Sequence, residues 1–140
     1  MSDKSPIMTF HITIDKTLIS DFTTPEGRVV IIPFTGSVES EIFTGTILPG
    51  AADVQTGDSD GLVHMCAKYM FRGKDRDGSE CHLFVENNGC LRPGQADEIV
   101  HATPTFRTDS DTLRECLSGK EFRTEVHPSE GGVDILVFAE

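Results

Sequence analysis

Apolar and polar residues alternate with a period of two through much of the chain. The clearest run is LVHMCAKYMFR, between Leu62 and Arg72. One face of this run carries every second residue from Val63 onward and is apolar, while the other face is mostly polar. Because side chains of a strand point alternately to its two sides, the run predicts a half-buried strand with Ala67 and Tyr69 on its inner face.

A turn signal and a second alternating run follow directly. Asp77-Gly78 in KDRDGSE is typical of a hairpin turn, and CHLFVENN after it predicts the returning strand. Leu83, Val85 and Asn87 share one face of that strand. If the apolar members face the core, Asn87 is carried inward with them, and a buried amide needs hydrogen-bond partners. Asn87 is therefore a candidate site residue.

Other parts of the chain predict further strands through alternating or β-branched runs. These runs are TFHITI, RVVIIPFTGSVE, IVHATPTFRT and VDILVFAE. Pro33 in the second of them predicts an edge, a bulge or a bend, because proline cannot donate to a strand ladder. One helix is expected in DSDTLRECL, where Asp109 or Asp111 would cap a short amphipathic turn that ends near Gly119.

The many strands, the Gly-rich turns and the lack of crossover helices indicate an all-β protein. Between a sandwich and a barrel, we favour a single antiparallel β-barrel with one short helix near the C-terminus. Barrel closure removes strand edges, and Gly36, Gly45 and Gly50 offer places for strands to bend. With 140 residues and no repeat or linker, the chain is expected to form one domain over residues 1–140.

The charge and the cysteines of the chain bear on its partners, its cellular location and its redox state. The chain has 12 Lys and Arg against 23 Asp and Glu, and the net charge of −11 disfavours nucleic acid and anionic membranes as partners. No apolar run reaches the length of a membrane span and no signal-peptide layout is visible, so a cytoplasmic location is expected. The cysteines lack CxxC spacing and are expected to be reduced, including Cys81 and Cys90, which could otherwise close a hairpin-sized loop.

Zinc-protease, P-loop and Rossmann motifs are absent from the sequence. It contains no HExxH, GxxxxGK[ST] or GxGxxG. The five histidines are far apart in sequence. His64 and His82 are expected to form an exposed polar pair across the predicted hairpin rather than a metal site. We therefore expect neither a metal nor a cofactor.

The remaining polar candidates lie in apolar surroundings. Asp53 follows two alanines and is either a turn residue bonded to backbone N–H groups or a buried carboxylate with a shifted pKa. His101 either lines the lumen as an acid/base or lies on the outer face of an apolar strand. Tyr69 needs a partner for its hydroxyl. Several of these groups would converge on one interior if the strands close into a barrel.

The succession of short motifs resembles the domain-of-unknown-function family DUF3237. The motifs are IPFTGSVES, TGTILPGAADVQTGDSDG, AKYMF, VENNG and TPTFRT, and they lie between about Gly27 and the C-terminus. LPG-x-AD-x-Q is the most specific of them. The resemblance implies a small antiparallel barrel of calycin (lipocalin-like) architecture that often forms homo-oligomers. Most members have no assigned activity, and some fungal relatives in polyketide pathways are cofactor-independent cyclases.

The resemblance also assigns family positions to individual residues. The family's characteristic polar positions correspond to Glu39, Asp53, Gln55, Tyr69 and Asn87. The chain departs from the family pattern at Ala51, Val54, Asp58, Cys66, Lys68 and His101. In the family, arginine is common at the positions of Asp58, Lys68 and His101, and lysine lacks its bidentate fork, so a carboxylate-binding site that relies on those arginines would be weakened here.

Three functions remain open at this point. The first is an enzyme, a cyclase or isomerase that acts on a small organic, polyketide-like substrate, with Asp53, Tyr69 and Glu39 as catalytic residues. Its ligand-binding residues would be Gln55, Asn87 and His101. The second is a barrel that binds a small apolar ligand without chemistry. The third is a structural or oligomeric domain whose lumen is filled by its own side chains. A raised pKa of Asp53 would favour the enzyme, and an open lumen would favour either of the first two.

Overall fold

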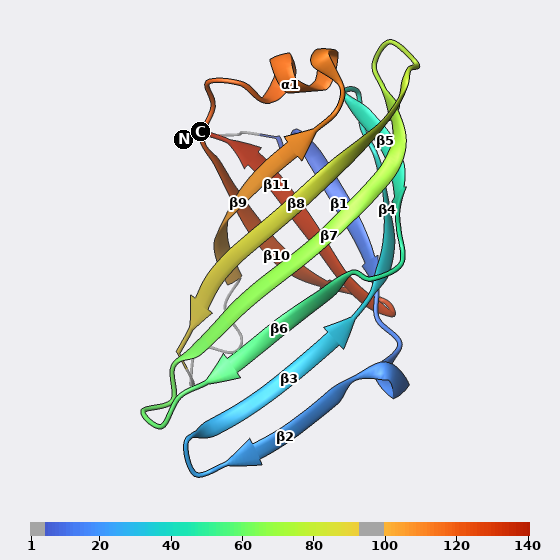
Figure 1. Cartoon of the computed structure of the whole chain (residues 1–140). Helices are drawn as coiled ribbons and strands as arrows, with labels where there is room; N and C mark the ends of the chain where they lie inside the picture. Colours follow the sequence, from blue (N-terminus) through green and yellow to red (C-terminus); the bar gives the residue numbers. More distant parts are fainter. Residues whose placement is uncertain (1–4, 93–99) are drawn as a thin grey trace.

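Strands make up most of the chain in the computed structural model (Figure 1), which describes residues 5–92 and 100–140, and the side chains of all of these except 100 and 101. The first elements are β1 Met8–Thr13, the 3-10 turn η1 Lys16–Leu18, β2 Ser20–Thr24, β3 Gly27–Pro33, β4 Thr35–Glu39, β5 Phe43–Ile47 and β6 Ala52–Gly57. The later elements are β7 Val63–Asp75, β8 Glu80–Leu91, β9 Val100–Thr108, the helix α1 Asp111–Leu117, β10 Phe122–Ser129 and β11 Gly132–Ala139.

Eight of the strands close into an antiparallel barrel. Hydrogen-bonded neighbours follow the order β7-β5-β4-β1-β11-β10-β9-β8, and the pairing of β7 with β8 closes the ring. Closure leaves the wall of the ring without a free strand edge. The predicted all-β antiparallel barrel with one short helix near the C-terminus is therefore confirmed.

The three remaining strands extend the sheet beyond the ring. The second half of β7 pairs with β5 over Phe71–Asp75, whereas its first half pairs with β6 over Val63–Lys68. β3 and β2 follow β6 in order, so β2–β3–β6 forms an extension at the lower end of Figure 1. Pro33 ends β3 just before the chain enters the ring as β4, which agrees with the interruption predicted there, since proline has no N–H for the ladder.

Large apolar side chains fill the upper half of the barrel. Phe10, Phe43, Phe71 and Leu83 are fully buried in it. The rings of Phe10 and Phe71 have their centroids 4.8 Å apart. α1 covers this end of the barrel (Figure 1) and adds Leu113 to the same core. Each such side chain contributes about 1.5–3 kcal/mol by leaving water, so this half is the main source of packing energy.

The β7–β8 turn and the start of α1 share one buried hydrogen-bond network. Asp75 accepts the backbone N–H groups of Asp77 and Ser79 with one carboxylate oxygen, at 2.9 and 3.1 Å. The hydroxyl of Ser110 donates to its other oxygen at 2.6 Å. Gly78 takes the left-handed conformation at φ 80° that the turn requires. The predicted Asp77-Gly78 hairpin is confirmed, and the turn is tied directly to the helix.

The residue that caps α1 differs from the expectation. Ser110 is the N-cap and accepts the N–H of Leu113 at 3.0 Å. Asp109 instead accepts the backbone N–H of His82 at 2.7 Å and lies 2.8 Å from its ring Nδ1. Asp111 is already the first helical residue. The expected caps Asp109 and Asp111 are therefore wrong, because β8 engages the first and the helix contains the second.

The register of β7 and β8 separates their histidines and cysteines. His64 lies opposite Cys90 and His82 lies opposite Arg72, so the expected pair of histidines does not form. All four cysteines are free thiols, so Cys81 and Cys90 form no disulfide. In the described part of the chain, no helix is both long enough and apolar enough to cross a membrane.

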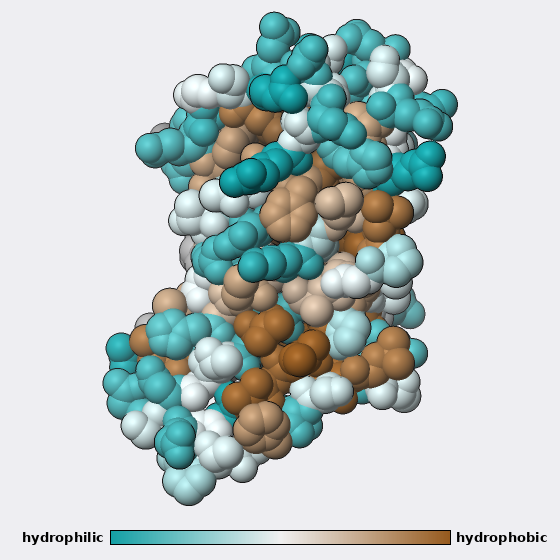
Figure 2. Space-filling model, in the orientation of Figure 1, coloured by the Kyte–Doolittle hydropathy of each residue, from teal (hydrophilic) through white to brown (hydrophobic). Residues whose placement is uncertain are grey.

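Exposed apolar side chains lie on the outer face of the extension. Phe22, Ile31 and Val54 are large, exposed members of β2, β3 and β6. Ile31 and Val54 are direct cross-strand partners, and brown side chains gather in the lower half of Figure 2. The clean alternation of apolar inner and polar outer residues therefore does not hold in the extension.

Candidate functional site

The lower half of the barrel holds a cavity of about 270 Å³. The extension supplies one wall through β3 and β6, and β10 and β11 supply another. Ala67, Gly89 and Ala102 line the cavity at positions where larger residues would fill it. The cavity exists because the inner faces of β7, β8 and β9 carry small residues here, in contrast to the phenylalanines of the upper half.

Cross-strand register brings the polar side chains of this cavity together. Ala67 has Asp53 as its partner on one side and Asn87 as its partner on the other. The next pair along β6 and β7 joins Gln55 to Met65. Partners in adjacent strands point to the same face of the sheet, so Asp53 and Asn87 flank the small Ala67 side chain. Both residues line the cavity, as does Gln55.

Asp53 is a partly satisfied carboxylate at the cavity wall. Its Oδ2 accepts a hydrogen bond from Gln55 Nε2 at 2.9 Å. Its Oδ1 is buried and has no partner among the residues that the structure describes. Burial raises the pKa of Asp53 above the ordinary aspartate value of 3.8, although the Gln55 bond partly offsets this. Such a carboxyl binds a proton more readily than an exposed aspartate does.

Tyr69 lies one inward position above Ala67 and packs against Phe34, which lines the cavity, although Tyr69 itself is not among the described lining residues. Its ring packs edge-on against Phe34 at 5.1 Å and Phe10 at 5.9 Å between centroids. Its hydroxyl is buried and finds no hydrogen-bond partner within the described ranges. Burial, and then the charge of Asp53, raise the pKa of Tyr69. The hydroxyl therefore stays protonated and can donate a hydrogen bond.

The side-chain amide of Asn87 has a hydrogen-bond partner at its nitrogen but none at its oxygen in the described structure. Its Nδ2 donates to Thr124 Oγ1 at 3.0 Å, and that hydroxyl donates to the carbonyl of Ala102 at 3.2 Å. These bonds fix the amide so that its Oδ1 is buried without a partner in the described structure. The inward position of Asn87 was predicted from alternation and is confirmed. Thr124 was not predicted, although the alternation in FRTEVHPS places it on the same face as Val126, which lines the cavity.

Glu39 is not brought into this arrangement. It is exposed, because Val38 beside it in β4 is buried and alternation turns the next side chain outward. Glu39 therefore does not line the cavity with Asp53, and its catalytic role stays a prediction. The backbone of His101 lies in β9 opposite Glu125, and its side chain lies outside the described part of the structure.

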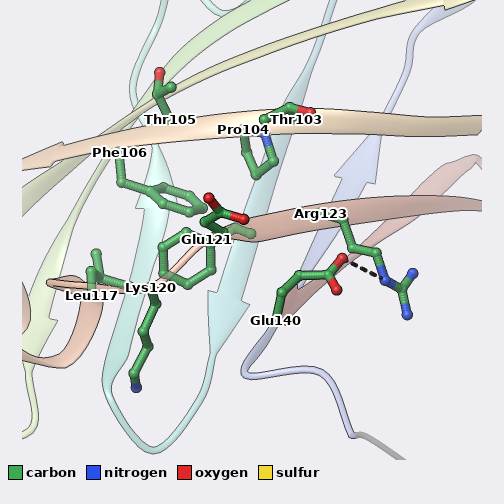
Figure 3. A pocket seen from close by; sticks show the side chains of 10 residues that line it. Thr103, Pro104, Thr105, Phe106, Leu117, Lys120, Glu121, Arg123 and Glu140 are labelled. Carbon is green, nitrogen blue, oxygen red and sulfur yellow. Dashed lines mark ion pairs between the residues drawn. The ribbon is translucent and has the colours of Figure 1, made fainter. Parts of the chain in front are cut away.

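A larger surface groove of about 660 Å³ lies between β9, β10 and the segment after α1 (Figure 3). The rings of Phe106 and Phe122 meet edge-on in it, with centroids 5.1 Å apart. Arg123 Nε forms an ion pair with Glu140 at 3.2 Å on its rim. The lumen differs from this groove in holding three buried polar atoms without a partner in the described structure, so we take the lumen as the candidate site.

Metal ligation is not supported in the described ranges. They contain no group of three or more His, Cys, Asp or Glu side chains placed to hold a metal ion. The site carries the Asp53 carboxylate, the side-chain amides of Gln55 and Asn87, and the Tyr69 phenol. These groups are suited to hydrogen bonding and proton transfer.

Comparison with known proteins gives relatives without assigned activities. A UPF0311 protein of Clostridium acetobutylicum is 32% identical over 84 residues, which are 59% of this chain and 51% of that protein, so the match spans about half of the relative's length. A crystal structure of a protein of unknown function from the same species has a TM-score of 0.77 at 24% identity and covers 99% of both chains.

Two further solved structures share the fold. A conserved protein of unknown function from Rhodopseudomonas palustris has a TM-score of 0.75 at 24% identity, covering 98% of this chain and 96% of that one. A β-barrel-like protein from Acinetobacter baumannii has a TM-score of 0.69 at 20% identity, covering 98% and 94%. The family model described as "Protein of unknown function (DUF3237)" matches residues 3–131. The chain therefore belongs to the DUF3237 family of proteins of unknown function.

Proposed function

We propose that the cavity binds a small, largely apolar organic molecule that carries a carbonyl oxygen, and that Asp53 moves a proton on it. One observation supports this above all others. Asp53 Oδ1, Tyr69 OH and Asn87 Oδ1 are the three buried side-chain polar atoms without a partner in the described structure. Each unpaired buried polar group costs about 1–3 kcal/mol. A ligand that pairs with all three atoms would recover that free energy.

The three atoms suit distinct parts of such a ligand. Tyr69 would donate its hydroxyl hydrogen bond to the carbonyl oxygen, and Asn87 Oδ1 would accept a hydrogen bond from a ligand hydroxyl. Asp53, ionised, would take a proton from the carbon beside the carbonyl, and the negative charge would pass to the oxygen held by Tyr69. Return of the proton to another position would complete an isomerisation, and attack by the enolate on a second group would complete a cyclisation.

The raised pKa of Asp53 bears on the choice between chemistry and binding alone. A general base works best when its pKa approaches the working pH, and burial moves Asp53 in that direction. A carboxylate with hydrogen-bond donors at both oxygens would have moved the other way, as Asp75 has, through the Ser110 hydroxyl first and then the backbone N–H groups of Ser79 and Asp77. These opposite shifts support an enzyme over a passive carrier.

Cavity size limits the substrate. At 270 Å³, the cavity has the volume of roughly nine water molecules at about 30 Å³ each. A molecule of one ring with a few substituents fits this volume, and an extended multi-ring substrate does not. The aliphatic lining, which includes Ile12, Ile32 and Val126, favours a mainly apolar body.

The experiment uses a panel of one-ring ketones in deuterated buffer. Proton NMR would report binding through shifts of the Ala67 and Val126 methyl groups, and chemistry through exchange of ketone α-protons for deuterium. We expect the protein to bind members of the panel and accelerate exchange. Asp53→Asn should bind equally and lose exchange by about a hundredfold.

Ala67→Leu is the matched control, because it fills the cavity and leaves Asp53, Tyr69 and Asn87 in place. It should lose both binding and exchange. Binding without exchange would support the non-catalytic ligand barrel instead. If no member of the panel binds, or if Ala67→Leu exchanges ketone protons as fast as the parent protein, the cavity is not the site.

A further inference from the structure

A thiol, an imidazole and a carboxylate meet on the outer face of the β7–β8 hairpin. Cys90 and His64 are direct cross-strand partners, and Cys90 Sγ lies 3.4 Å from His64 Nδ1. The other ring nitrogen of His64 lies 3.7 Å from Asp58 Oδ2. The cluster points away from the lumen, because His64 belongs to the outward phase of β7. It is therefore separate from the Asp53 cavity.

The β6–β7 turn holds Asp58 in place for this contact. Asp58 Oδ1 accepts the N–H of Leu62 at 3.0 Å, and the Asp58 carbonyl accepts the N–H of Gly61 at 3.0 Å. These bonds use one carboxylate oxygen and leave Oδ2 directed to His64. At 3.7 Å, Asp58 Oδ2 forms no direct hydrogen bond with His64 Nε2, but its negative charge favours a proton on that nitrogen, which leaves Nδ1 as an acceptor for the thiol proton.

A surface groove of about 420 Å³ gives small molecules access to the cluster. Its lining includes Cys90, His64, Val54 and Cys66. Cys90 is exposed, whereas Cys81 is buried, and burial raises the pKa of the Cys81 thiol. All four cysteines lie in the described ranges, and Cys90 is the one whose sulfur contacts a histidine ring. Geometry therefore singles it out as the reactive thiol.

We propose that Cys90 is a modification site that forms mixed disulfides with small disulfide molecules. His64 takes the proton from the Cys90 thiol, and the thiolate attacks one sulfur of R–S–S–R. The S–S bond of the small molecule breaks, and the departing R–S⁻ takes the proton back from His64. The products are Cys90–S–S–R and R–SH, so Cys90 is oxidised while the departing half of the disulfide is reduced.

The mixed disulfide should persist on the protein. Cys66 is a diagonal neighbour of Cys90, since its own partner is Asn88. Diagonal residues of an antiparallel pair lie about 7–8 Å apart, and a disulfide needs Cα atoms about 4.4–6.8 Å apart. Cys66 therefore does not displace the bound group, and an external thiol is required.

Charge around the groove selects the disulfide. The carboxylates of Asp58 and Asp60 lie beside the cluster with Arg92 near Asp60, and the chain has a net charge of −11. A disulfide with positive ends, such as cystamine, should approach more readily than an anionic one, such as glutathione disulfide. Added salt should reduce the difference between the rates at which Cys90 reacts with the two disulfides.

The test measures the rate at which each cysteine of the reduced, full-length protein reacts with cystamine. Aliquots are quenched with acid, and peptide mass spectrometry gives the mixed-disulfide fraction at all four cysteines. We expect Cys90 to react at least about tenfold faster than the half-buried Cys116. His64→Gln should slow Cys90 about tenfold, and Asp58→Asn about threefold, while the rate at Cys116 stays unchanged.

His82→Gln is the matched control, since this half-buried histidine also pairs with an aspartate but lies near the turn end of the hairpin. It should leave the Cys90 rate unchanged. The ratio of Cys90 to Cys116 rates within one sample separates activation from any general loosening of the fold. If Cys90 reacts no faster than Cys116, or if His64→Gln leaves its rate unchanged, Cys90 is not an activated thiol.

Discussion

The two halves of the barrel share strands and alternation but differ in what their inward residues do. In the half under α1, Phe10, Phe43 and Phe71 fill the lumen completely. In the half beside the extension, Ala67 and Gly89 take the equivalent inward positions and leave a cavity. The same β7 and β8 contribute to both halves. Side-chain volume at a few inward positions, and not backbone topology, therefore decides whether this barrel is solid or hollow.

The two halves also differ in the surroundings they give to a carboxylate, and the pKa shifts of the two carboxylates are opposite. Asp75, at the filled end, accepts hydrogen bonds from two backbone N–H groups and from the Ser110 hydroxyl. These bonds, with the Ser110 hydroxyl the largest cause, lower the pKa of Asp75. Asp53, at the hollow end, accepts a hydrogen bond from Gln55, and burial raises its pKa although Gln55 and the backbone of Cys66 partly offset the rise. The first carboxylate stabilises the fold, and the second is left available for a ligand.

The largest expected loss of stability comes from truncating a buried side chain in the filled half. Leu83→Ala removes a fully buried side chain and should cost about 3–4 kcal/mol of unfolding free energy, because the packed surroundings cannot collapse into the space. Met65→Ala, in the cavity wall, should cost about 1 kcal/mol, since it enlarges a space that is already open. Chemical denaturation measures both variants. Equal losses would contradict the contrast between the halves.

Ser110→Ala should give the next largest effect. It removes the N-cap of α1 and the hydroxyl that donates to Asp75, at a cost of about 2 kcal/mol at neutral pH. The depressed pKa of Asp75 makes its contribution present above the unfolded value of 3.8 and lost as the pH falls through the folded value. The loss in Ser110→Ala should therefore shrink in acid. A loss that stays constant with pH would show that only the cap matters.

Asp53→Asn should change stability in the opposite direction. Because the folded pKa of Asp53 is raised, the ionised carboxylate destabilises the fold at neutral pH, and the penalty disappears as the pH falls through the folded pKa. The asparagine variant should therefore be more stable than the parent by on the order of 1 kcal/mol at neutral pH. The gain should vanish toward the unfolded value of 3.8. Urea unfolding at several pH values would measure it, and a loss of stability at neutral pH would count against a strained carboxylate.

The smallest change in stability is expected for Ala67→Leu. The added side chain enters the cavity instead of a packed core, so the free energy of unfolding should stay within about 1 kcal/mol of the parent. Leucine at an inward alanine of a filled core would cost more, through overpacking. Thermal unfolding measures this change. A loss as large as that of Leu83→Ala would mean that the lower half is already filled.

Local alternation was enough to predict the inner faces of β7 and β8. It predicted the inward turn of Asn87 and the Asp77-Gly78 hairpin, because each depends on neighbours in one or two strands. Glu39 was included through the family resemblance and not through alternation, and in the structure Val38 is the buried residue of β4 while Glu39 beside it is exposed. The cap of α1 was predicted from residue type alone, which could not show that Asp109 is engaged by His82 in a distant strand.

The hollow half could not be predicted from the sequence in the same way. Whether Ala67 and Gly89 leave space depends on which residues face them across the barrel, and that follows from closure rather than from any one strand. The bulky inward side chains of Met65, Tyr69, Phe71 and Leu83 indicate a filled lumen as one alternative. The last three are buried in the structure, whereas Met65 lines the cavity. Cys90 and His64 are likewise 26 positions apart in the sequence, and only the register of β7 and β8 shows that they lie opposite each other.

The most direct test of the account is the titration of both carboxylates in one sample. Carbon-13 NMR of aspartate-labelled protein would follow Asp53 and Asp75, with Asp53→Asn used to assign the first resonance. We expect Asp53 to titrate above 3.8 and Asp75 below it. A saturating ketone from the panel should move Asp53 and leave Asp75 unchanged. If Asp53 titrates below 3.8, the hollow half holds a structural carboxylate, and its role in proton transfer is contradicted.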